Sequence, residues 1–531
     1  MLTKAKKILA FALALTTVSV MMVGCKKAET PSDSGTSGPL ATLTVEVFDR
    51  GKAGQAPLDN NYWTKWINDN FGKSNNATVQ FIPVPRTQEV DKLNVLMAAN
   101  TAPDICFTYD QGTVYNYVKQ DGLAQLDSPL SKVGPALSKY LGKDVLKYGT
   151  FNGKLYSIPA KRTIVANLGT FIRKDWLDKL GLPLPKTRDD FYNDLVAFRD
   201  KNPGGVTGVI PYAYAVGSGI NIGTGNLMDS FVPKLTEEQL ATLYTIGSAQ
   251  ANWNLPGYKD YVKFMNKLYN ENLISHDFAI DKTQSQAISA LTSGKAGAVS
   301  GNWDFIYRAS PGIYSALKKN VPTAEFVPVD CFQNSQGKYT KQIYTPNGAF
   351  IMIPKASKNV DLAVKYLNWM SDSKVTLFLQ NGQEGVDYNL VDGIPKPVQP
   401  STLTGDKQIA VAYNGDYDMM SNGIELGSAD KNTLAISAGY PGFENDVKLA
   451  AKLNMTDSFT LYYHSIPNTS FAKYSQTLAD KSLQMLSKLI TAKPADYDSL
   501  FNGQLSEYMS AGGQTVLDEY KANYKTETAK K

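Results

Sequence analysis

Apolar and polar residues follow a regular pattern from about residue 42 onward, and this pattern predicts strands and helices in alternation. Leu43, Val45 and Val47 point to one face of a first strand, and Thr44 and Glu46 point to the other. The next elements are predicted as helix, strand, helix and strand, with apolar positions at 63–71, 79–81, 90–97 and 104–107. Strands that alternate with helices predict a parallel sheet and place the chain in the α/β class.

Turn and capping residues mark the borders of further elements. Asn152 and Gly153 lie between apolar residues, which predicts a tight hairpin over 151–156. Thr187 is predicted to cap a helix, and Asp190, three residues later, is expected to bond back to the cap.

Two apolar patterns in the second half of the chain predict buried elements. The run 349–353 is typical of a buried strand, and the helix after it is expected to bury Ala363, Leu367 and Met370. The C-terminal part is predicted to be mainly helical. Its buried stripe is expected at Leu483, Leu486 and Ile490.

The first 25 residues have the pattern of an export signal. Three lysines at positions 4, 6 and 7 precede an apolar run over 8–23. This run is shorter than the ~20 residues that a membrane-spanning helix needs. Gly24 and Cys25 end the run and resemble the lipobox of bacterial lipoproteins, with Met22 in place of the usual leucine. The resemblance implies cleavage after residue 24 and acylation of Cys25; an ordinary signal peptide with an incidental cysteine is the alternative.

The segment after the cysteine has the composition of a tether. Residues 26–40 are rich in Ser, Gly, Pro and Thr and have few large apolar side chains. Such a segment cannot bury enough surface to offset the entropy of ordering it, so we predict a flexible linker over 25–41 behind a signal peptide over 1–24. About 490 residues follow, too many for one core, so at least two lobes are expected.

Composition excludes several kinds of function. Two histidines, His276 and His464, argue against zinc sites and histidine-dependent catalytic triads. No serine-hydrolase or nucleotide-binding motif is present, so the remaining enzyme classes need only carboxylates, as in glycoside hydrolysis. The net charge is +5 without a basic stripe, so nucleic acid is not expected as a partner.

The cysteines and tyrosines add two weaker expectations. Cys106 lies in an apolar run and is expected to be a buried free thiol, although pairing with Cys331 stays open. The 30 tyrosines suit a surface that offers flat apolar faces and hydroxyl groups to a polar ligand. Most of them are nevertheless expected to fill half-buried positions.

A set of ordered motifs behind the leader resembles one protein family. The motifs are 102–105 (APDI), 121–127 (DGLAQLD), 153–159 (GKLYSIP), 173–182 (RKDWLDKLGL), 293–297 (SGKAG), 301–303 (GNW) and 384–388 (EGVDY). Each motif is weak alone, but their order and spacing resemble the extracellular solute-binding proteins of ABC transporters. The resemblance is to the sugar- and oligosaccharide-binding group, and within it to long LplA-like lipoproteins.

This resemblance implies a two-lobed, periplasmic-binding-protein-like α/β fold with a hinge and an interlobe cleft. The N-terminal lobe is expected at 42–165 plus 345–410, and the C-terminal lobe at 166–344 plus 411–531. Both lobes would close on the ligand and satisfy its hydroxyl groups from two sides. Long members of the group carry a calcium loop after the 173–182 motif. Residues 200–211 lack its acidic ligands, so we predict neither calcium nor another metal or cofactor.

Candidate ligand residues are aromatic or charged groups at strand ends and in loops. Trp303 is the first choice, because related binders place a stacking tryptophan at this point, and a core tryptophan is the alternative. The ends of the first and third strands add further candidates, since open α/β sheets bind ligands there; solvated loop positions are the alternative for these. The full set is Trp303, Asp49, Arg50, Tyr109, Asp110, Arg173, Trp253, Tyr344 and Tyr388.

The sequence therefore predicts a non-enzymatic, monomeric binding lipoprotein on the extracellular face of a Gram-positive-type membrane. It would capture a carbohydrate, most naturally an oligosaccharide, and pass it to the permease subunits of an ABC importer. An exported carbohydrate-active enzyme, a surface adhesin or sensor, and a binder of peptide or another polar solute are the alternatives.

Overall fold

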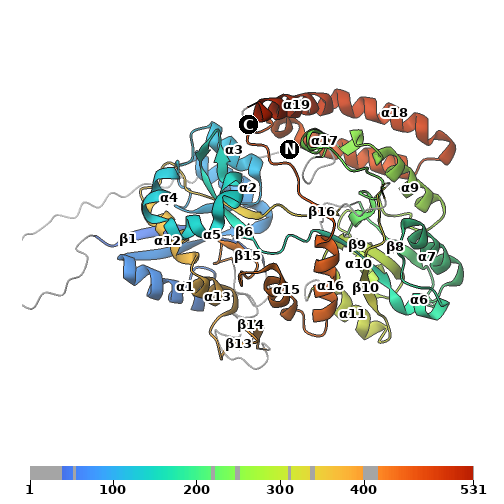
Figure 1. Cartoon of the computed structure of the whole chain (residues 1–531), viewed down its shortest axis with the longest axis horizontal. Coiled ribbons are helices and arrows are strands. Elements are labelled where there is room, and N and C mark those ends of the chain that lie inside the picture. The colour runs from blue at the N-terminus through green and yellow to red at the C-terminus, as the bar shows by residue number, and fades with distance from the viewer. Residues whose placement is uncertain are drawn as a thin grey trace, which may run out of the picture. The chain divides into compact units, whose positions relative to one another are not determined.

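The computed structural model describes residues 39–51, 56–216, 222–244, 252–308, 312–334, 336, 341–398 and 416–529. Ala41–Lys531 forms one compact unit. The predicted signal peptide, Cys25 and most of the predicted linker lie outside the described residues. Helices and strands mix throughout, in two groups that we call the first and second lobes (Figure 1).

The first lobe is built around a mixed sheet. Its strands, in spatial order, are β2 (Ala77–Pro85), β1 (Ala41–Asp49), β3 (Cys106–Thr108), β12 (Asn347–Met352), β6 (Ser157–Arg162) and β15 (Ser421–Asn422). β1 is parallel to β2, and a parallel bridge between Val45 and Ile105 joins β1 to β3. The predicted parallel pairing is found at β1, β2 and β3, but β12 departs from it. This strand enters from the second lobe and pairs antiparallel with both β3 and β6.

Helices of the first lobe cover this sheet and bury an apolar core. They are α1 (Tyr62–Ile67), α2 (Glu89–Ala98), α3 (Gln111–Lys119), α4 (Asp127–Val133), α5 (Pro135–Leu146), α12 (Val360–Met370) and α13 (Ser373–Asn381). The predicted apolar face of α12 is confirmed, because Ala363, Leu367 and Met370 are all buried. Trp63 is also buried in this core, and Trp66 stacks on Phe378.

The predicted hairpin is confirmed in β4 (Thr150–Phe151) and β5 (Lys154–Leu155). Asn152 and Gly153 have φ values of 51° and 78°. Two successive positive φ angles are what a two-residue turn between right-twisted strands requires, and Asn-Gly adopts them at little cost.

The second lobe has its own four-stranded sheet. Its order is β10 (Phe326–Val329), β7 (Leu168–Arg173), β9 (Ala296–Asn302) and β8 (Ile210–Ala213). β7 runs antiparallel to both neighbours, and β8 is parallel to β9. All seven residues of β9 are buried. A side chain at Gly297 would meet the Phe198 ring at 2.4 Å and the Pro211 carbonyl oxygen at 2.9 Å, so only glycine fits this contact between β9 and α7.

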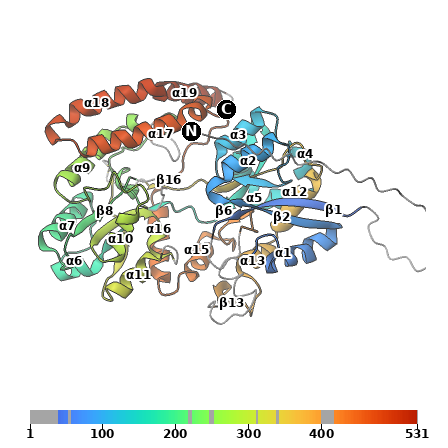
Figure 2. The same cartoon turned by 180° about the vertical axis from the view of Figure 1, so that it is seen from behind.

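The helices of the second lobe are α6 (Lys174–Leu180), α7 (Arg188–Lys201), α8 (Glu237–Thr242), α9 (Tyr258–Asn270), α10 (Ser285–Thr292), α11 (Ile313–Asn320), α15 (Ala429–Ala438), α16 (Glu444–Met455), α17 (Thr469–Ile490), α18 (Tyr497–Tyr508) and α19 (Gln514–Thr528). Figures 1 and 2 both show α17, α18 and α19 as a layer beside α9. Short strands complete the fold: β11 (Lys341–Gln342) pairs with β16 (Ser458–Phe459), and β13 (Tyr388–Val391) with β14 (Ile394–Pro397).

One helix prediction in this lobe is confirmed and the other only in part, because Ile490 is buried and Leu486 is half-buried but Leu483 is exposed. Thr187 caps α7 and Asp190 bonds back to it, as its spacing predicts. Leu483, expected in the buried stripe of α17, is 42% exposed. The buried face is Leu478, Met485, Leu489 and Ile490, because α17 turns that face toward α9.

Three chain segments connect the lobes, and together they form the hinge. The chain leaves β6 at Arg162 and enters β7 at Leu168, returns through Tyr344 to β12, and leaves again after β15. The segments bond to one another: the Arg162 N–H donates to Pro346 O at 2.8 Å, and the Tyr344 N–H donates to Val165 O at 2.9 Å. The Thr163 N–H donates to Asn422 O at 3.2 Å.

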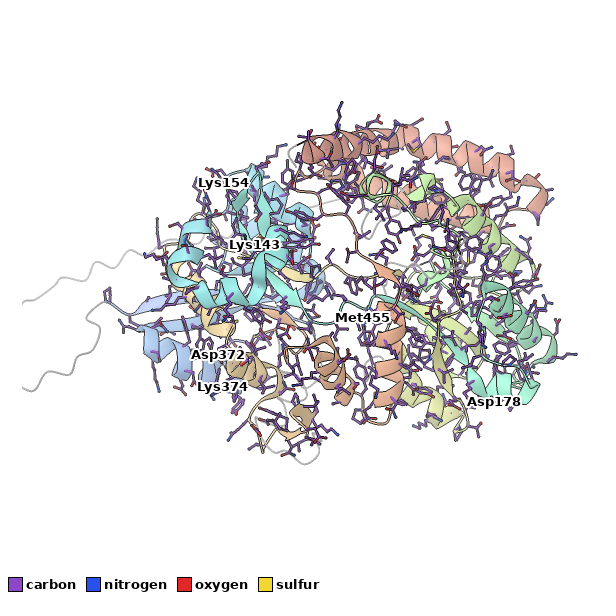
Figure 3. All side chains as sticks on the ribbon, in the orientation of Figure 1. Lys143, Lys154, Asp178, Asp372, Lys374 and Met455 are labelled. Atoms are coloured by element: carbon purple, nitrogen blue, oxygen red, sulfur yellow. The ribbon has the colours of Figure 1, made fainter. Side chains whose placement is uncertain are left out.

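The division into lobes at the predicted boundaries stays a prediction. Tyr417, Met419 and Met420 pack in the core of the first lobe, although the predicted boundary assigns them to the second. Figure 3 shows Lys143 on α5 of the first lobe and Asp178 on α6 of the second, on opposite sides of the hinge segments. The Tyr463 hydroxyl donates to Lys147 O and Thr150 O, so it links the C-terminal region to the first lobe.

Candidate functional site

Aromatic and arginine side chains gather where the hinge segments meet the first sheet. Tyr109 directly follows β3, Arg162 is the last residue of β6, and Tyr344 precedes β12. The guanidinium carbon of Arg162 lies 4.3 Å from the centre of the Tyr344 ring. Its Nε donates to Asn347 O at 3.3 Å. We call Tyr109, Arg162 and Tyr344, with the neighbours described next, the hinge site.

Tyr109 presents part of its ring to solvent on the first-lobe side of the hinge site. The residue is 39% exposed. The guanidinium carbon of Arg86 lies 5.0 Å from the centres of both the Tyr109 and Phe48 rings. Burial and the charge of Asp416 raise the pKa of Tyr109, while nearby Arg50, Arg86 and Arg162 lower it. The tyrosine is therefore a neutral hydrogen-bond donor with an accessible face at neutral pH.

Most arginines around the hinge site are matched by carboxylates. Arg50 donates through Nε and Nη2 to both oxygens of Asp416, each at 2.9 Å. Arg86 pairs with Glu89 at 2.7 Å. These pairs hold the side chains in fixed positions, since a guanidinium–carboxylate fork restrains both groups.

The second lobe adds a polar wall opposite these residues. Arg308 donates to both oxygens of Asp304, at 3.0 and 2.5 Å, and the Tyr440 hydroxyl donates to the same carboxylate. Burial and Asp304 raise the pKa of Tyr440 well above its usual range. Asn302 Nδ2 lies 3.4 Å from the Tyr344 hydroxyl, which connects this wall to the hinge segment.

A cavity of about 340 Å³ opens beside this wall and takes lining from both lobes. Arg308 and Tyr440 contribute from the second lobe, and Asn381, Pro395 and Pro397 contribute from α13 and β14 of the first. The remaining lining residues are Ile424, Ala435, Ile436 and Gly439. A cavity between two lobes, with convergent polar groups at its edge, is the usual setting of a small-molecule site.

The structure brings three predicted ligand residues together and gives two others local roles. Arg50, Tyr109 and Tyr344 all belong to the hinge region. Asp49 Oδ1 accepts the Gly51 N–H at 2.9 Å. Asp110 caps α3 and accepts the N–H groups of Gly112 and Thr113. The proposed contact of these residues with a ligand stays a prediction.

The other four predicted ligand residues are buried. Trp303 is 5% exposed and packs in a core of the second lobe. The Trp253 indole N–H donates to Ser482 Oγ at 2.8 Å inside another core. Tyr388 is buried on β13. Arg173 ends β7 at the strand end away from the hinge and pairs with Asp175 at 2.7 Å. None of the four joins the hinge site, and their contact with a ligand stays a prediction.

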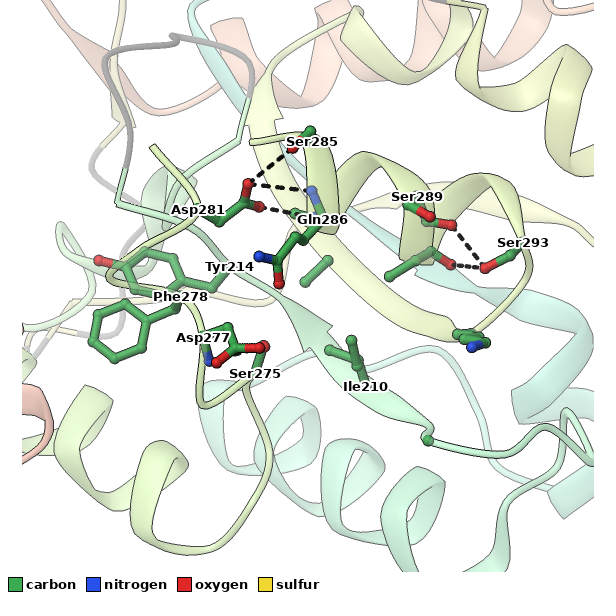
Figure 4. A pocket seen from close by; sticks show the side chains of 15 residues that line it. Ile210, Tyr214, Ser275, Asp277, Phe278, Asp281, Ser285, Gln286, Ser289 and Ser293 are labelled. Atoms are coloured by element: carbon green, nitrogen blue, oxygen red, sulfur yellow. Dashed lines mark hydrogen bonds between the residues drawn. The ribbon is translucent and has the colours of Figure 1, made fainter. Parts of the chain in front are cut away.

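A second cavity, of about 400 Å³, lies within the second lobe between α10 and β8 (Figure 4). Some of its polar groups bond within the protein. Asp281 accepts the N–H groups of Gln286 and Ala287 at 3.2 and 2.9 Å, and Ser293 Oγ donates to Ser289 O at 2.7 Å.

The described ranges contain neither a metal-ligand cluster nor a membrane-spanning helix. There, no three His, Cys, Asp or Glu side chains are grouped as metal ligands. In the loop where calcium is not expected, the Asn202 amide bonds to the backbone of Val206 instead. None of the helices in the described part of the chain combines the length and apolar character needed to cross a bilayer. Both Cys106 and Cys331 are free and buried.

Sequence reasoning found Arg50 but missed the other arginines of this site. It examined the ends of the first and third strands, and therefore found Arg50 and Tyr109. Arg162 occupies the equivalent position at the end of a later strand, just before the chain crosses to the second lobe. Arg86, Arg308 and Tyr440 reach the site through tertiary packing, and no local pattern marks them.

The chain is similar to several curated bacterial proteins. It is 28% identical over 389 residues to Lipoprotein LipO of Bacillus subtilis, an alignment that covers 72% of this chain and 74% of that protein. It is 23% identical over 516 residues to the polygalacturonan/rhamnogalacturonan-binding protein YtcQ of the same species, with 95% and 96% of the two chains covered.

Solved structures and a family profile agree with this similarity. The ABC-transporter substrate-binding protein FusA of S. pneumoniae in complex with kestose superposes with a TM-score of 0.66 at 17% identity, covering 92% of this chain and 100% of FusA. Alginate-binding protein AlgQ2 without calcium gives a TM-score of 0.62 at 17% identity and covers 92% of this chain and 99% of its own. These likenesses confirm the two-lobed fold. The profile of the bacterial extracellular solute-binding proteins matches residues 56–377, and the chain belongs to that family.

Proposed function

We propose that this protein is a membrane-anchored receptor that captures an oligosaccharide at the hinge site and delivers it to an ABC importer. The observation that carries the proposal is the convergence of Tyr109, Tyr344 and Arg162 where the lobes join, beside a cavity lined from both lobes. Membership of the solute-binding family supports the proposal. So do the names of relatives such as the diacetylchitobiose-binding protein DasA of Streptomyces coelicolor.

The chemistry of the hinge site suits a sugar. A pyranose ring has flat C–H faces that pack on tyrosine, and its hydroxyl groups need donors and acceptors at fixed angles. Each guanidinium carries five N–H donors in a rigid plane. The carboxylates of Asp304 and Asp416 hold Arg308 and Arg50 in place, so the site is arranged before a ligand arrives.

The same carboxylates favour binding over hydrolysis. A glycoside hydrolase needs two carboxyl groups about 5–10 Å apart that are free to donate a proton and to attack. Among the described residues of the hinge site, Asp304 is held by Arg308 and Tyr440, and Asp416 is held by Arg50. We therefore propose a monomeric receptor without enzymatic activity, metal or cofactor.

The binding proposal predicts that oligosaccharides stabilise the folded protein. Ligand at 100 times its dissociation constant adds about 2.7 kcal/mol to the free energy of unfolding. A thermal-shift screen with mono- and oligosaccharides, followed by titration calorimetry, measures this. A melting temperature that rises with a peptide or an amine, and with no carbohydrate, would show that the ligand class is wrong. Release of reducing sugar from a bound glycan would show that the protein is an enzyme.

We further propose that acylated Cys25 anchors the protein on the outer face of the cell membrane. Similarity to a relative named a lipoprotein supports this. Two or more acyl chains give stable attachment, whereas one chain gives only reversible binding.

Changing Cys25→Ala is expected to move most of the protein from the membrane fraction to the medium and to abolish labelling with radioactive palmitate. The reason is that the thiol is the proposed acylation site. The control variant Lys26→Ala, which changes the next residue, should leave the membrane location and the palmitate labelling unchanged. Membrane retention of the Cys25→Ala protein would mean that another segment holds it.

A further inference from the structure

Arg162 differs from the other arginines near the hinge site in its electrostatic surroundings. Its contacts are the ring of Tyr344, 4.3 Å from the guanidinium carbon, and the carbonyl oxygen of Asn347. Among the described residues, no carboxylate lies within ion-pair distance of its guanidinium group. Arg50, Arg86 and Arg308 each have such a partner.

This charge is also poorly solvated. Burial lowers the pKa of Arg162, and Tyr344 and Tyr109 counter that effect only in part. A half-buried guanidinium without an anion costs free energy, since the part of its hydration that is lost is not repaid by an ion pair. The charge lies over the Tyr344 ring and within electrostatic reach of Tyr109. A group that lies there would meet the charge directly.

We propose that the ligand supplies the missing anion: a carboxylate of an acidic oligosaccharide, one that contains uronic acid, pairs with Arg162. This inference rests on the proposed function and narrows its substrate class. A carboxylate matches the planar fork of a guanidinium, and two parallel N–H···O bonds fix its orientation as well as its charge. Arg50 and Arg86 are already paired with Asp416 and Glu89, which leaves Arg162 as the arginine of the first-lobe side that a ligand carboxylate can pair with.

The first part of the test compares acidic and neutral ligands on the full lipoprotein, purified in detergent. Titration calorimetry with tri- and tetragalacturonate should give dissociation constants at least 10-fold lower than with the same oligomers after reduction of their carboxyl groups. Affinity should also fall as salt rises from 50 to 500 mM, since a charge pair is screened. Tighter binding of the reduced oligomers, of a sugar phosphate or of triglutamate would overturn the inference. Failure of every carbohydrate, acidic or neutral, would overturn the proposed function with it.

The second part uses Arg162→Gln, which keeps an amide donor but removes the charge. Truncating one member of a desolvated charge pair typically weakens binding about 30-fold or more. We expect this loss for trigalacturonate and less than a threefold change for the reduced oligomer. The melting temperature without ligand should be equal to or above that of the parent protein, because a half-buried charge without an ion-pair partner has been removed. Equal losses for the acidic and the reduced oligomer, or no loss, would overturn the inference.

The chain offers a matched control in Arg188. Its guanidinium carbon lies 3.9 Å from the centre of the Phe231 ring, and burial lowers its pKa too. It stands at the start of α7 in the second lobe and is not a neighbour of the hinge tyrosines. Arg188→Gln therefore makes the same change of charge in a similar environment. It should leave the affinity for trigalacturonate within twofold of the parent protein; a loss as large as that of Arg162→Gln would show that only net charge matters.

Discussion

Tyr109→Ala is expected to weaken oligosaccharide binding by about 10- to 100-fold and to change the melting temperature of the free protein little. The ring is 39% exposed at the end of β3, so its accessible face is available to a sugar and contributes little to the core. Truncating a tyrosine at the centre of a binding site typically costs about 2 kcal/mol or more. The change also removes the ring over which Arg86 lies, which is worth about 0.5–1 kcal/mol. Titration calorimetry with the best ligand of the carbohydrate screen measures the effect.

Two further variants separate the face of the Tyr109 ring from its hydroxyl group and from general destabilisation. Tyr109→Phe keeps the face of the ring, so its affinity for the oligosaccharide should fall by less than about fivefold, since one neutral hydrogen bond contributes about 1 kcal/mol. Tyr192→Ala removes a tyrosine of α7 that bonds to Glu271, distant in the chain from the hinge segments. It should leave the affinity unchanged even where it lowers the melting temperature. Unchanged affinity in Tyr109→Ala would place the sugar elsewhere.

Glu46→Gln is expected to stabilise the protein at pH 8 and to remove part of its pH dependence. Glu46 is 2% exposed on β1, and its Oε1 has no hydrogen-bond partner among the described residues. Its Oε2 accepts a long bond from the Phe107 N–H, and the carboxyl group also interacts with the Cys106 thiol. Burial is the main cause that raises the pKa of this carboxyl to about 8, and the nearby Glu89 adds to it. The folded protein therefore holds a proton that the unfolded chain releases near the ordinary glutamate pKa of 4.5.

The sign of the effect follows from this difference in bound protons. Between pH 4.5 and 8 the folded state binds more protons, so the free energy of unfolding falls as pH rises through that window. One pKa unit corresponds to about 1.36 kcal/mol, so the cost near neutral pH is on the order of 2–3 kcal/mol. Asp194, Asp229 and Asp418 act in the same direction, since burial raises the pKa of each to about 7.

Urea unfolding at pH 5 and pH 8 measures this prediction. The urea midpoint of the parent protein should be lower at pH 8 than at pH 5. In Glu46→Gln the two midpoints should lie closer together. Asp144→Asn, a change of an exposed carboxylate on α5 of the same lobe, should leave the difference as it is. Equal midpoints for parent and Glu46→Gln at pH 8 would mean that the buried carboxyl is solvated in a way the structure does not show.

Local features of the fold could be predicted from sequence, because local chemistry sets them. The Asn152-Gly153 turn and the Thr187 cap depend on backbone angles and bonds within a few residues. Glu46 shows the limit of such reasoning. Its alternation with Val45 and Val47 predicts an outward-facing polar residue, yet β1 lies between β2 and β3, and Glu46 is buried at the Phe107 backbone. The antiparallel place of β12 likewise depends on partners far away in the chain.

The candidate site was predictable to a similar extent. Tyr109 and Arg50 follow strands, and strand ends are where such folds bind ligands. Trp303 was the first choice because the family resemblance marks its position, but its ring is packed into a core. Arg162 carries no such mark. Among the described residues it has no carboxylate within ion-pair distance, and this can be recognised only in the folded structure.

The hinge also determines the order in which a growing chain can acquire its structure. The sheet of the second lobe draws its strands from Leu168 to Val329, a single stretch. The sheet of the first lobe starts at Ala41 but needs β12, where Ile351 meets Ile158, and β15 at its edge. Pairings between such distant segments form slowly, because a long loop must close first. We therefore expect the sheet of the first lobe to form after the sheet of the second lobe, although the first lobe begins the chain. Until residue 422 is available, its unpaired strands would depend on chaperones for protection.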